Sequence, residues 1–329
     1  MTVNYIALSK NEPKHTSQQS FNQVSFIEVG EEEAGQRLDN FLIKNLKGVP
    51  KSRIYRMMRK GEVRVNKGRV KPTSRLEKGD VVRIPPIRIS EQKSPAVPGQ
   101  QLRKYLQDNI LFEDEAMLVL NKPSGLAVHG GSGISMGVIE ALRAERPKEK
   151  FLELVHRLDR ETSGCLMLAK KRSALISLQE QMKKGLIEKH YLTLVKGKWP
   201  KGKRTVNAPL KKSLLTSGER IVRVDVEGKN AVTHFKIRST LASSTLLEVA
   251  LETGRTHQIR VHCQFSGHPL AGDDKYGDDV FNKELKGSGL NRLFLHACYL
   301  RFKHPISGDW VEVEAETPSD LLSVLSALT

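Results

Sequence analysis

The sequence predicts an α+β protein in which a strand-rich domain follows a small basic module. Three observations lead to this prediction. A chain of 329 residues is long enough for about two domains. From Ile110 to the C-terminus, short apolar stretches of strand length alternate with a few helical patterns. Between the two regions, Pro95, Pro98 and Gly99 stand among Ser, Glu, Gln and Lys, a composition typical of a linker.

These composition changes predict four segments. Residues 1–24 are polar and have little apolar periodicity, so we expect a flexible tail. Residues 25–90 form the basic module, residues 91–104 the linker, and residues 105–329 the strand-rich domain.

Two helices and short strands are expected in the basic module. Apolar residues at helical spacing predict the first helix: they are Leu38, Phe41, Leu42 and Leu46. Pro50 suits the start of a second helix and Gly61 its end. The alternation of Val63 and Val65, and a run at 81–84, predict strands.

In the strand-rich domain, the apolar pattern separates strands from helices. The expected strands are 117–120, 165–169, 191–195, 246–251 and 292–302. The expected helices are 174–184, 256–266 and a last one that starts at Ser319.

Positive charge is concentrated in the basic module. The whole chain has 54 Lys and Arg against 37 Asp and Glu, a net charge of +17. Residues 37–90 hold sixteen Lys or Arg and four Asp or Glu, a net charge of +12. Unless this is only a solvated basic face, it indicates a polyanionic partner, and we expect nucleic acid rather than an anionic membrane. The expected RNA contacts are the cations of the second helix: Lys51, Arg53, Arg56, Arg59 and Lys60.

We expect a cytoplasmic, monomeric protein. No apolar run is long enough to span a membrane, and residues 1–10 lack the pattern of a signal peptide. The three cysteines are odd in number and lie in apolar surroundings, which predicts reduced core residues: they are Cys165, Cys263 and Cys298.

No metal or cofactor is expected. His257, His262 and Cys263 are close in sequence but lack the spacing of a zinc site. The stretch Gly130-Gly131-Ser132-Gly133 is not followed by Gly-Lys-Ser/Thr, so we interpret it as a turn rather than a phosphate-binding loop.

The stretch His156-Arg157-Leu158-Asp159-Arg160-Glu161-Thr162-Ser163-Gly164 places one carboxylate between two guanidinium groups. An apolar run at 165–169 follows, so Asp159 is expected on the loop that enters a buried strand. Positive neighbours favour the ionised carboxylate, which suits nucleophilic or electrostatic work. The alternative is a surface ion pair of little energetic value.

This stretch resembles HRLDRxTSG, the motif of the RluA-type RNA pseudouridine synthases. Four further segments resemble family motifs in the same order: 120–129, 253–262, 267–270 and 293–297. The resemblance covers about residues 108–318. It implies a large, mostly antiparallel mixed sheet with a cleft, and an isomerase that converts uridine in RNA to pseudouridine without a cofactor.

The resemblance also assigns roles to residues. Asp159 is the expected catalytic carboxylate, which attacks the ribose or removes a proton to give a glycal. Arg260 is expected to pair with it, and Tyr191 to stack on the target base. Arg157 is expected to fill the gap left by the extruded base, and Leu295 to line the base pocket.

The basic module resembles an S4 RNA-binding domain at Arg37-Leu38-Asp39 and Ser52-Arg53-Ile54. Within the family, the similarity is greatest to members that modify several uridines of 23S ribosomal RNA. It is carried by residues 46–52, 59–67, 128–133, 151–155, 217–224 and 289–297. Two alternatives remain: a synthase acting on another ribosomal or transfer RNA site, and a non-catalytic RNA-binding assembly protein.

Overall fold

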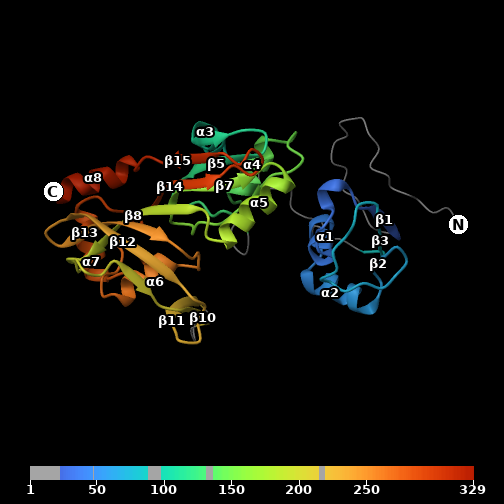
Figure 1. Cartoon of the computed structure of the whole chain (residues 1–329), viewed down its shortest axis with the longest axis horizontal. Helices are drawn as coiled ribbons and strands as arrows, with labels where there is room; N and C mark the ends of the chain where they lie inside the picture. The colour runs from blue at the N-terminus through green and yellow to red at the C-terminus, as the bar shows by residue number, and fades with distance from the viewer. Residues whose placement is uncertain (1–22, 47, 88–97, 131–135, 215–218) are drawn as a thin grey trace. The chain divides into compact units, whose positions relative to one another are not determined.

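The computed structural model describes residues 23–46, 48–87, 98–130, 136–214 and 219–329. The chain divides into two compact units, residues 1–95 and 96–329 (Figure 1). The predicted tail up to residue 22, most of the predicted linker and residues 131–133 of the glycine-rich turn lie outside the described residues. No helix in the described ranges is both long and apolar enough to cross a membrane.

The N-terminal unit is a small α/β module. Its elements are β1 (Ser25–Glu28), the 3₁₀ helix η1 (Glu31–Glu33), α1 (Leu38–Asn45), α2 (Lys51–Lys60), β2 (Arg64–Val65) and β3 (Val81–Ile84). The strands form an antiparallel sheet in the order β1-β3-β2. Both predicted helices are confirmed, and Gly61 ends α2 in the left-handed conformation at φ 70°.

Helix α2 separates apolar from cationic side chains. Ile54, Met57 and Met58 are buried against the core of the unit. The five cations predicted to bind RNA are all exposed, because they occupy the other sides of this amphipathic helix.

The C-terminal unit contains most of the secondary structure. Its strands are β4 (Ile110–Glu113), β5 (Met117–Lys122), β6 (Glu153–Leu154), β7 (Ser163–Ala169), β8 (Glu188–Lys196), β9 (Thr205–Asn207), β10 (Leu210–Leu214), β11 (Arg220–Val224), β12 (Val232–Thr240), β13 (Ser244–Leu251), β14 (Leu295–Lys303) and β15 (Trp310–Glu314). Its helices are α3 (Gln100–Asp108), α4 (Val138–Glu145), α5 (Arg172–Lys183), α6 (Gln258–Phe265), α7 (Asp279–Gly287) and α8 (Ser319–Leu328).

Ten strands form one large sheet. Eight of them follow the order β4-β5-β7-β14-β8-β13-β12-β9, while β15 pairs with β14 and β6 with β7. Only the described pairing of β7 with β14 is parallel, so the expected mostly antiparallel mixed sheet is confirmed. Strands β10 and β11 form a separate two-stranded hairpin.

Helix α3 corrects one detail of the predicted linker. The helix begins at Gln100, inside the range 91–104, and Leu106 packs in the main core of the C-terminal unit. Pro98 and Gly99 directly before it suggested a linker, but they also suit the start of a helix.

The seam between β7 and β14 determines where the loop carrying Asp159 leaves the sheet. Ser163 and His296 face each other across it, with 2.9 Å between Ser163 Oγ and His296 Nδ1. The next residue, Gly164, has φ 106°, and a Cβ there would lie 2.2 Å from the Ala297 carbonyl oxygen. The two strands can therefore approach only because this position is glycine.

Candidate active site

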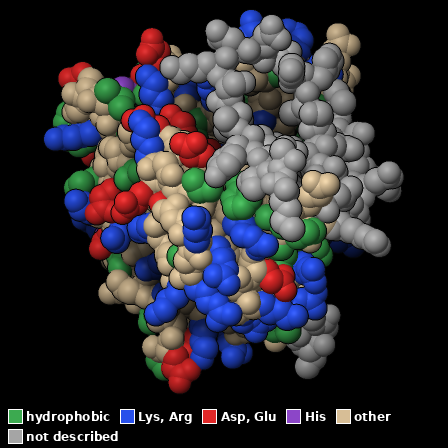
Figure 2. Space-filling model, turned by 90° about the vertical axis from the view of Figure 1, so that its right-hand side faces the viewer, with side chains coloured by type: hydrophobic (Ala, Val, Ile, Leu, Met, Phe, Trp, Pro, Cys, Tyr) green, Lys and Arg blue, Asp and Glu red, His purple; other side chains and the backbone are tan. Residues whose placement is uncertain are grey.

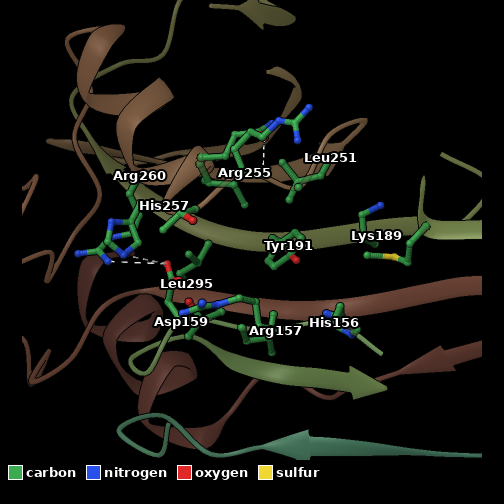
Figure 3. A pocket seen from close by; sticks show the side chains of 17 residues that line it. His156, Arg157, Asp159, Lys189, Tyr191, Leu251, Arg255, His257, Arg260 and Leu295 are labelled. Carbon is green, nitrogen blue, oxygen red and sulfur yellow. Dashed lines mark hydrogen bonds and ion pairs between the residues drawn. The ribbon is translucent and has the colours of Figure 1, made fainter. Parts of the chain in front are cut away.

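A pocket with a cavity volume of about 300 Å³ lies in the C-terminal unit (Figure 3). It joins side chains from the loop between β6 and β7, from β8, from α6 and from β14. The five residues predicted for the site all line it: Arg157, Asp159, Tyr191, Arg260 and Leu295. The fold thus brings together residues that are more than one hundred positions apart in sequence.

Asp159 lies on the predicted loop, four residues before β7. Its backbone carbonyl accepts a hydrogen bond from Thr162 N–H at 3.1 Å, which closes a turn. Its Oδ2 lies 3.8 Å from Arg260 Nη1 and 3.8 Å from His257 Nε2. Both distances are too long for hydrogen bonds, and the one to Arg260 corresponds to ion-pair spacing.

The cation next to Asp159 in sequence is engaged elsewhere. Arg160 forms an ion pair with Glu161 at 3.3 Å and donates to the Gly125 carbonyl at 3.1 Å. The described side-chain nitrogens nearest to Asp159 belong instead to Arg260 of α6 and to His257 just before it, which local charge pattern alone does not predict.

Arg260 is fixed by a carboxylate that the sequence analysis missed. Its Nε and Nη2 donate to the two carboxylate oxygens of Asp273 at 2.7 and 2.6 Å. Asp273 also accepts the backbone N–H groups of Lys275 and Tyr276, both at 2.9 Å. Burial alone would raise the pKa of Asp273, but Arg260 and these N–H groups outweigh it and hold the pKa below its usual range. Arg260 therefore holds a fixed orientation that leaves Nη1 facing Asp159.

Tyr191 and Leu295 provide the apolar part of the pocket. They lie on the paired strands β8 and β14, and both side chains are buried. Figure 3 shows Tyr191 in the middle of the pocket, between Asp159 and Lys189. Burial, reinforced by the negative charge of Asp159, raises the pKa of the Tyr191 phenol, so it stays protonated at neutral pH.

The end of the pocket beyond Tyr191 holds two groups without a predicted role. Lys189 is buried and donates to the Ile187 carbonyl at 3.1 Å, and burial lowers its pKa. His156 Nε2 accepts Met167 N–H at 3.1 Å. Burial, aided by the positive charge of Lys189, lowers the pKa of His156 to about 4, so this imidazole is neutral.

Arg157 lies in the lining of the pocket but is exposed to solvent, unlike the other four predicted residues. Its position suits contact with a large ligand rather than with a small molecule enclosed in the cavity.

A second hollow lies in the N-terminal unit. Arg53, Arg56 and Arg59 line it together with residues at the start of α2 and after β3. Lys51 and Lys60 are exposed at the two ends of the same helix. Lys and Arg side chains gather on the face seen in Figure 2. Such a surface binds phosphate groups.

In the parts of the chain that the structure describes, no group of three or more His, Cys, Asp or Glu side chains is placed to hold a metal ion. The chemistry available is that of a carboxylate beside a fixed guanidinium, an imidazole and an aromatic ring. Such a carboxylate can attack, or take a proton from, a ligand stacked on the ring.

Comparison with known proteins finds a matching family in each of the two units. Residues 116–265 match the family described as RNA pseudouridylate synthase, and residues 36–82 match the S4 domain. The chain is 57% identical over 308 residues to a protein named ribosomal large subunit pseudouridine synthase C in Salmonella typhi and in Escherichia coli strain K12. Each alignment covers 93% of this chain and 97% of the relative.

Solved structures resemble this chain over about two thirds of its length. Human RNA pseudouridylate synthase domain containing 4 matches with a TM-score of 0.58 and 28% identity, over 69% of this chain and 95% of that chain. Human RNA pseudouridylate synthase domain containing 1 matches with a TM-score of 0.52 and 26% identity, over 64% of this chain and 83% of that chain.

Proposed function

We propose, because this chain belongs to the RNA pseudouridylate synthase family, that it converts uridines of 23S ribosomal RNA to pseudouridine with Asp159 as the catalytic carboxylate. The relatives named for the large ribosomal subunit support this RNA, since their similarity extends over both units. The observation that carries the role of Asp159 is its place in a pocket beside an arginine fixed by a second carboxylate.

The reaction is an isomerisation that needs no oxidant or energy source. The bond between uracil N1 and ribose C1′ breaks, a bond between C5 and C1′ forms, and the proton on C5 is lost while N1 gains one. We assign the first step to Asp159, whose carboxylate acts on the ribose. Arg260 is already hydrogen-bonded to Asp273, so its longer contact with Asp159 orients the carboxylate without forming a hydrogen bond to it.

The remaining pocket residues would hold the base. The ring of Tyr191 offers a stacking surface, and Leu295 forms an apolar wall. The target nucleotide must leave its helical stack first, at a cost of about a few kcal/mol. We assign to the exposed Arg157 the role of filling the space the base leaves, and to the cations of α2 the electrostatic grip on the RNA.

The first test is Asp159→Asn, which keeps the size and shape of the side chain but removes the negative charge and replaces one acceptor oxygen by an amide donor. We expect unchanged affinity for unmodified 23S RNA transcript and a loss of pseudouridine formation of about 10⁴-fold or more. Asp309→Asn, a matched change at an exposed turn, should leave both unchanged. Pseudouridine formation by Asp159→Asn would refute the assignment of the carboxylate.

The choice of RNA is tested separately. Pseudouridines are mapped across ribosomal and transfer RNA in cells with and without the gene, and after complementation with wild type or Asp159→Asn. We expect 23S positions to lose pseudouridine and to recover it only with wild type. If 23S RNA is unchanged and a transfer RNA position is affected, the enzyme acts on the rival substrate. A growth or assembly defect that Asp159→Asn rescues would favour the non-catalytic alternative.

A further inference from the structure

A chain of contacts links the β10–β11 hairpin to Asp159 through two hydrogen bonds and one longer approach. Val222 N–H of β11 donates to the hydroxyl oxygen of Tyr276 at 3.0 Å. That hydroxyl lies 2.8 Å from His257 Nδ1, and His257 Nε2 lies 3.8 Å from Asp159 Oδ2. His257 therefore has one ring nitrogen on Tyr276. Its other ring nitrogen faces the Asp159 carboxylate (Figure 3).

This arrangement selects one tautomer of His257. The Tyr276 oxygen already accepts the Val222 N–H, so its own proton is satisfied best by donation to His257 Nδ1. The imidazole must then carry its proton on Nε2, the nitrogen that faces Asp159. In the opposite tautomer the Tyr276 oxygen would accept two protons, and its own hydroxyl proton would be left without any of the described partners.

The backbone of His257 is held in an unusual conformation that aims the ring. Its φ is 54°, and it is the one non-glycine residue with positive φ among the described residues of the C-terminal unit. Such a conformation costs about 1–3 kcal/mol and persists where neighbouring contacts impose it. Gln258 ties together the backbone on both sides of His257: its side-chain oxygen accepts from Arg255 N–H at 2.9 Å and from the Thr253 hydroxyl at 2.8 Å.

Burial, rather than the neighbouring charges, favours the neutral form of His257. The titratable and charged groups that face it are Asp159, Arg260, Asp273, Lys275 and Tyr276. Burial lowers the pKa of His257 below its ordinary value, and the positive charges of Arg260 and Lys275 oppose the pull of the two carboxylates. A neutral imidazole orients Asp159 through an N–H dipole. A charged one would add a second full cation, and a proton source, beside a carboxylate that must stay ionised.

We propose that His257 is a positioning residue of the reaction, which Tyr276 holds as the neutral tautomer whose Nε2–H orients Asp159. The contact at 3.8 Å shortens to a hydrogen bond when substrate closes the pocket, as happens in many active sites. This inference rests on the proposed function and adds to it a residue that controls the catalytic carboxylate.

Three variants separate positioning from a structural role. His257→Asn keeps an acceptor near the Nδ1 position and tolerates positive φ, but loses the group facing Asp159. His257→Gln places an amide N–H near the Nε2 position. Tyr276→Phe keeps the ring, which packs 5.0 Å from the Arg260 guanidinium, and removes only the hydroxyl. The probe is unmodified 23S transcript with tritium on uracil C5, and the readouts are single-turnover tritium release from pH 5 to 9 and RNA binding.

We expect His257→Asn to slow single turnover about 10- to 100-fold with unchanged RNA affinity, and His257→Gln to recover much of the rate. Tyr276→Phe removes a donor that stabilises the neutral imidazole. On the acidic side of the pH profile, activity should therefore begin to fall at a higher pH in this variant than in wild type. In His257→Asn, the part of this fall that is due to protonation of His257 should be missing.

Failure of this inference can be distinguished from failure of the proposed function. If His257→Asn reacts within twofold of wild type and Tyr276→Phe keeps the wild-type pH profile, His257 is structural and the inference fails. If His257→Asn does not fold, the pH profile of Tyr276→Phe decides alone. If wild type itself releases no tritium, the proposed function fails instead, whatever the variants do.

Discussion

The position of Asp159 depends on a glycine, Gly164, which has a hydrogen atom where every other residue has a Cβ. Gly164 lies between β5 and β14, opposite Lys122 on one side and Ala297 on the other. Its φ of 106° and the 2.2 Å gap that a Cβ would meet both exclude a side chain. Since the turn holding Asp159 ends where β7 begins, a shift of β7 at this seam would move the carboxylate with it.

Substitution of this glycine should cost far more than a change in backbone conformation alone. We expect Gly164→Ala to lower the free energy of unfolding by about 3 kcal/mol or more, because a backbone clash adds to the strain of positive φ. Gly185→Ala is the matched control: its φ is 71° and no atom lies within 4 Å of its Cβ position, so the cost should be about 1 kcal/mol. Equal losses in the two variants would show that the β7–β14 contact is not tight.

At the scale of elements, a charge cluster ties three parts of the C-terminal unit together. Glu113 of β4 accepts hydrogen bonds from Arg146, just after α4, and from Lys170, just after β7, the latter at 2.8 Å. Hydrogen bonds from Arg146, more than those from Lys170, lower the pKa of Glu113 to about 2 despite partial burial. The cluster therefore secures the edge of the sheet on which the pocket strands depend.

A depressed carboxyl pKa stabilises the fold above the unfolded value and ceases to do so as pH falls through the folded value. Glu113→Gln should therefore cost about 1–3 kcal/mol at pH 7, and this deficit should shrink between pH 4.5 and about 2. Urea unfolding followed by tryptophan fluorescence measures this unit alone, because the two tryptophans, Trp199 and Trp310, both belong to it. Glu115→Gln removes a highly exposed partner of Lys171 and should have no measurable effect. A deficit that is independent of pH would contradict the electrostatic account.

Elements with strong periodicity were predictable and the rest were not, for physical reasons. Strand 165–169 and helix 174–184 are buried on a clear apolar pattern, and both are confirmed as β7 and α5. Strand β12 was missed because polar residues alternate along its exposed side, as in Lys236 and Arg238.

The residues of the site, like the elements of the fold, were predictable only in part. Motif resemblance found the residues that line the pocket, but not Asp273 or Tyr276, which lie outside the matched motifs and whose contacts with Arg260 and His257 appear only in the fold. The structure explains the glycine next to Asp273: a Cβ at Gly272 would lie 2.0 Å from the Arg292 carbonyl oxygen, so no side chain fits in this turn.

For the whole molecule, the residues that we propose for catalysis and for electrostatic binding of RNA lie in different units. The pocket residues belong to the C-terminal unit, whereas most of the excess positive charge belongs to residues 37–90. Phosphate contacts provide affinity and position without reading sequence. Binding and chemistry should therefore be separable by mutation, which a single combined site would not allow.

The arginines of α2 offer that separation. Replacing Arg53, Arg56 and Arg59 together by Gln should weaken binding to 23S transcript and lower the slope of log affinity against log salt by about 2–3, since each lost phosphate contact removes about 0.7–0.9. The single-turnover rate at saturating RNA should stay within about twofold of wild type, because Asp159 and its partners are untouched.

Three exposed lysines of the C-terminal unit, replaced together by Gln, serve as a control of equal charge: Lys201, Lys283 and Lys286. If that control lowers the slope equally, only net charge matters. If the arginine variant keeps the wild-type slope, α2 does not bind the phosphate backbone. A slower saturated rate would mean that the N-terminal unit also helps to present the target uridine to Asp159.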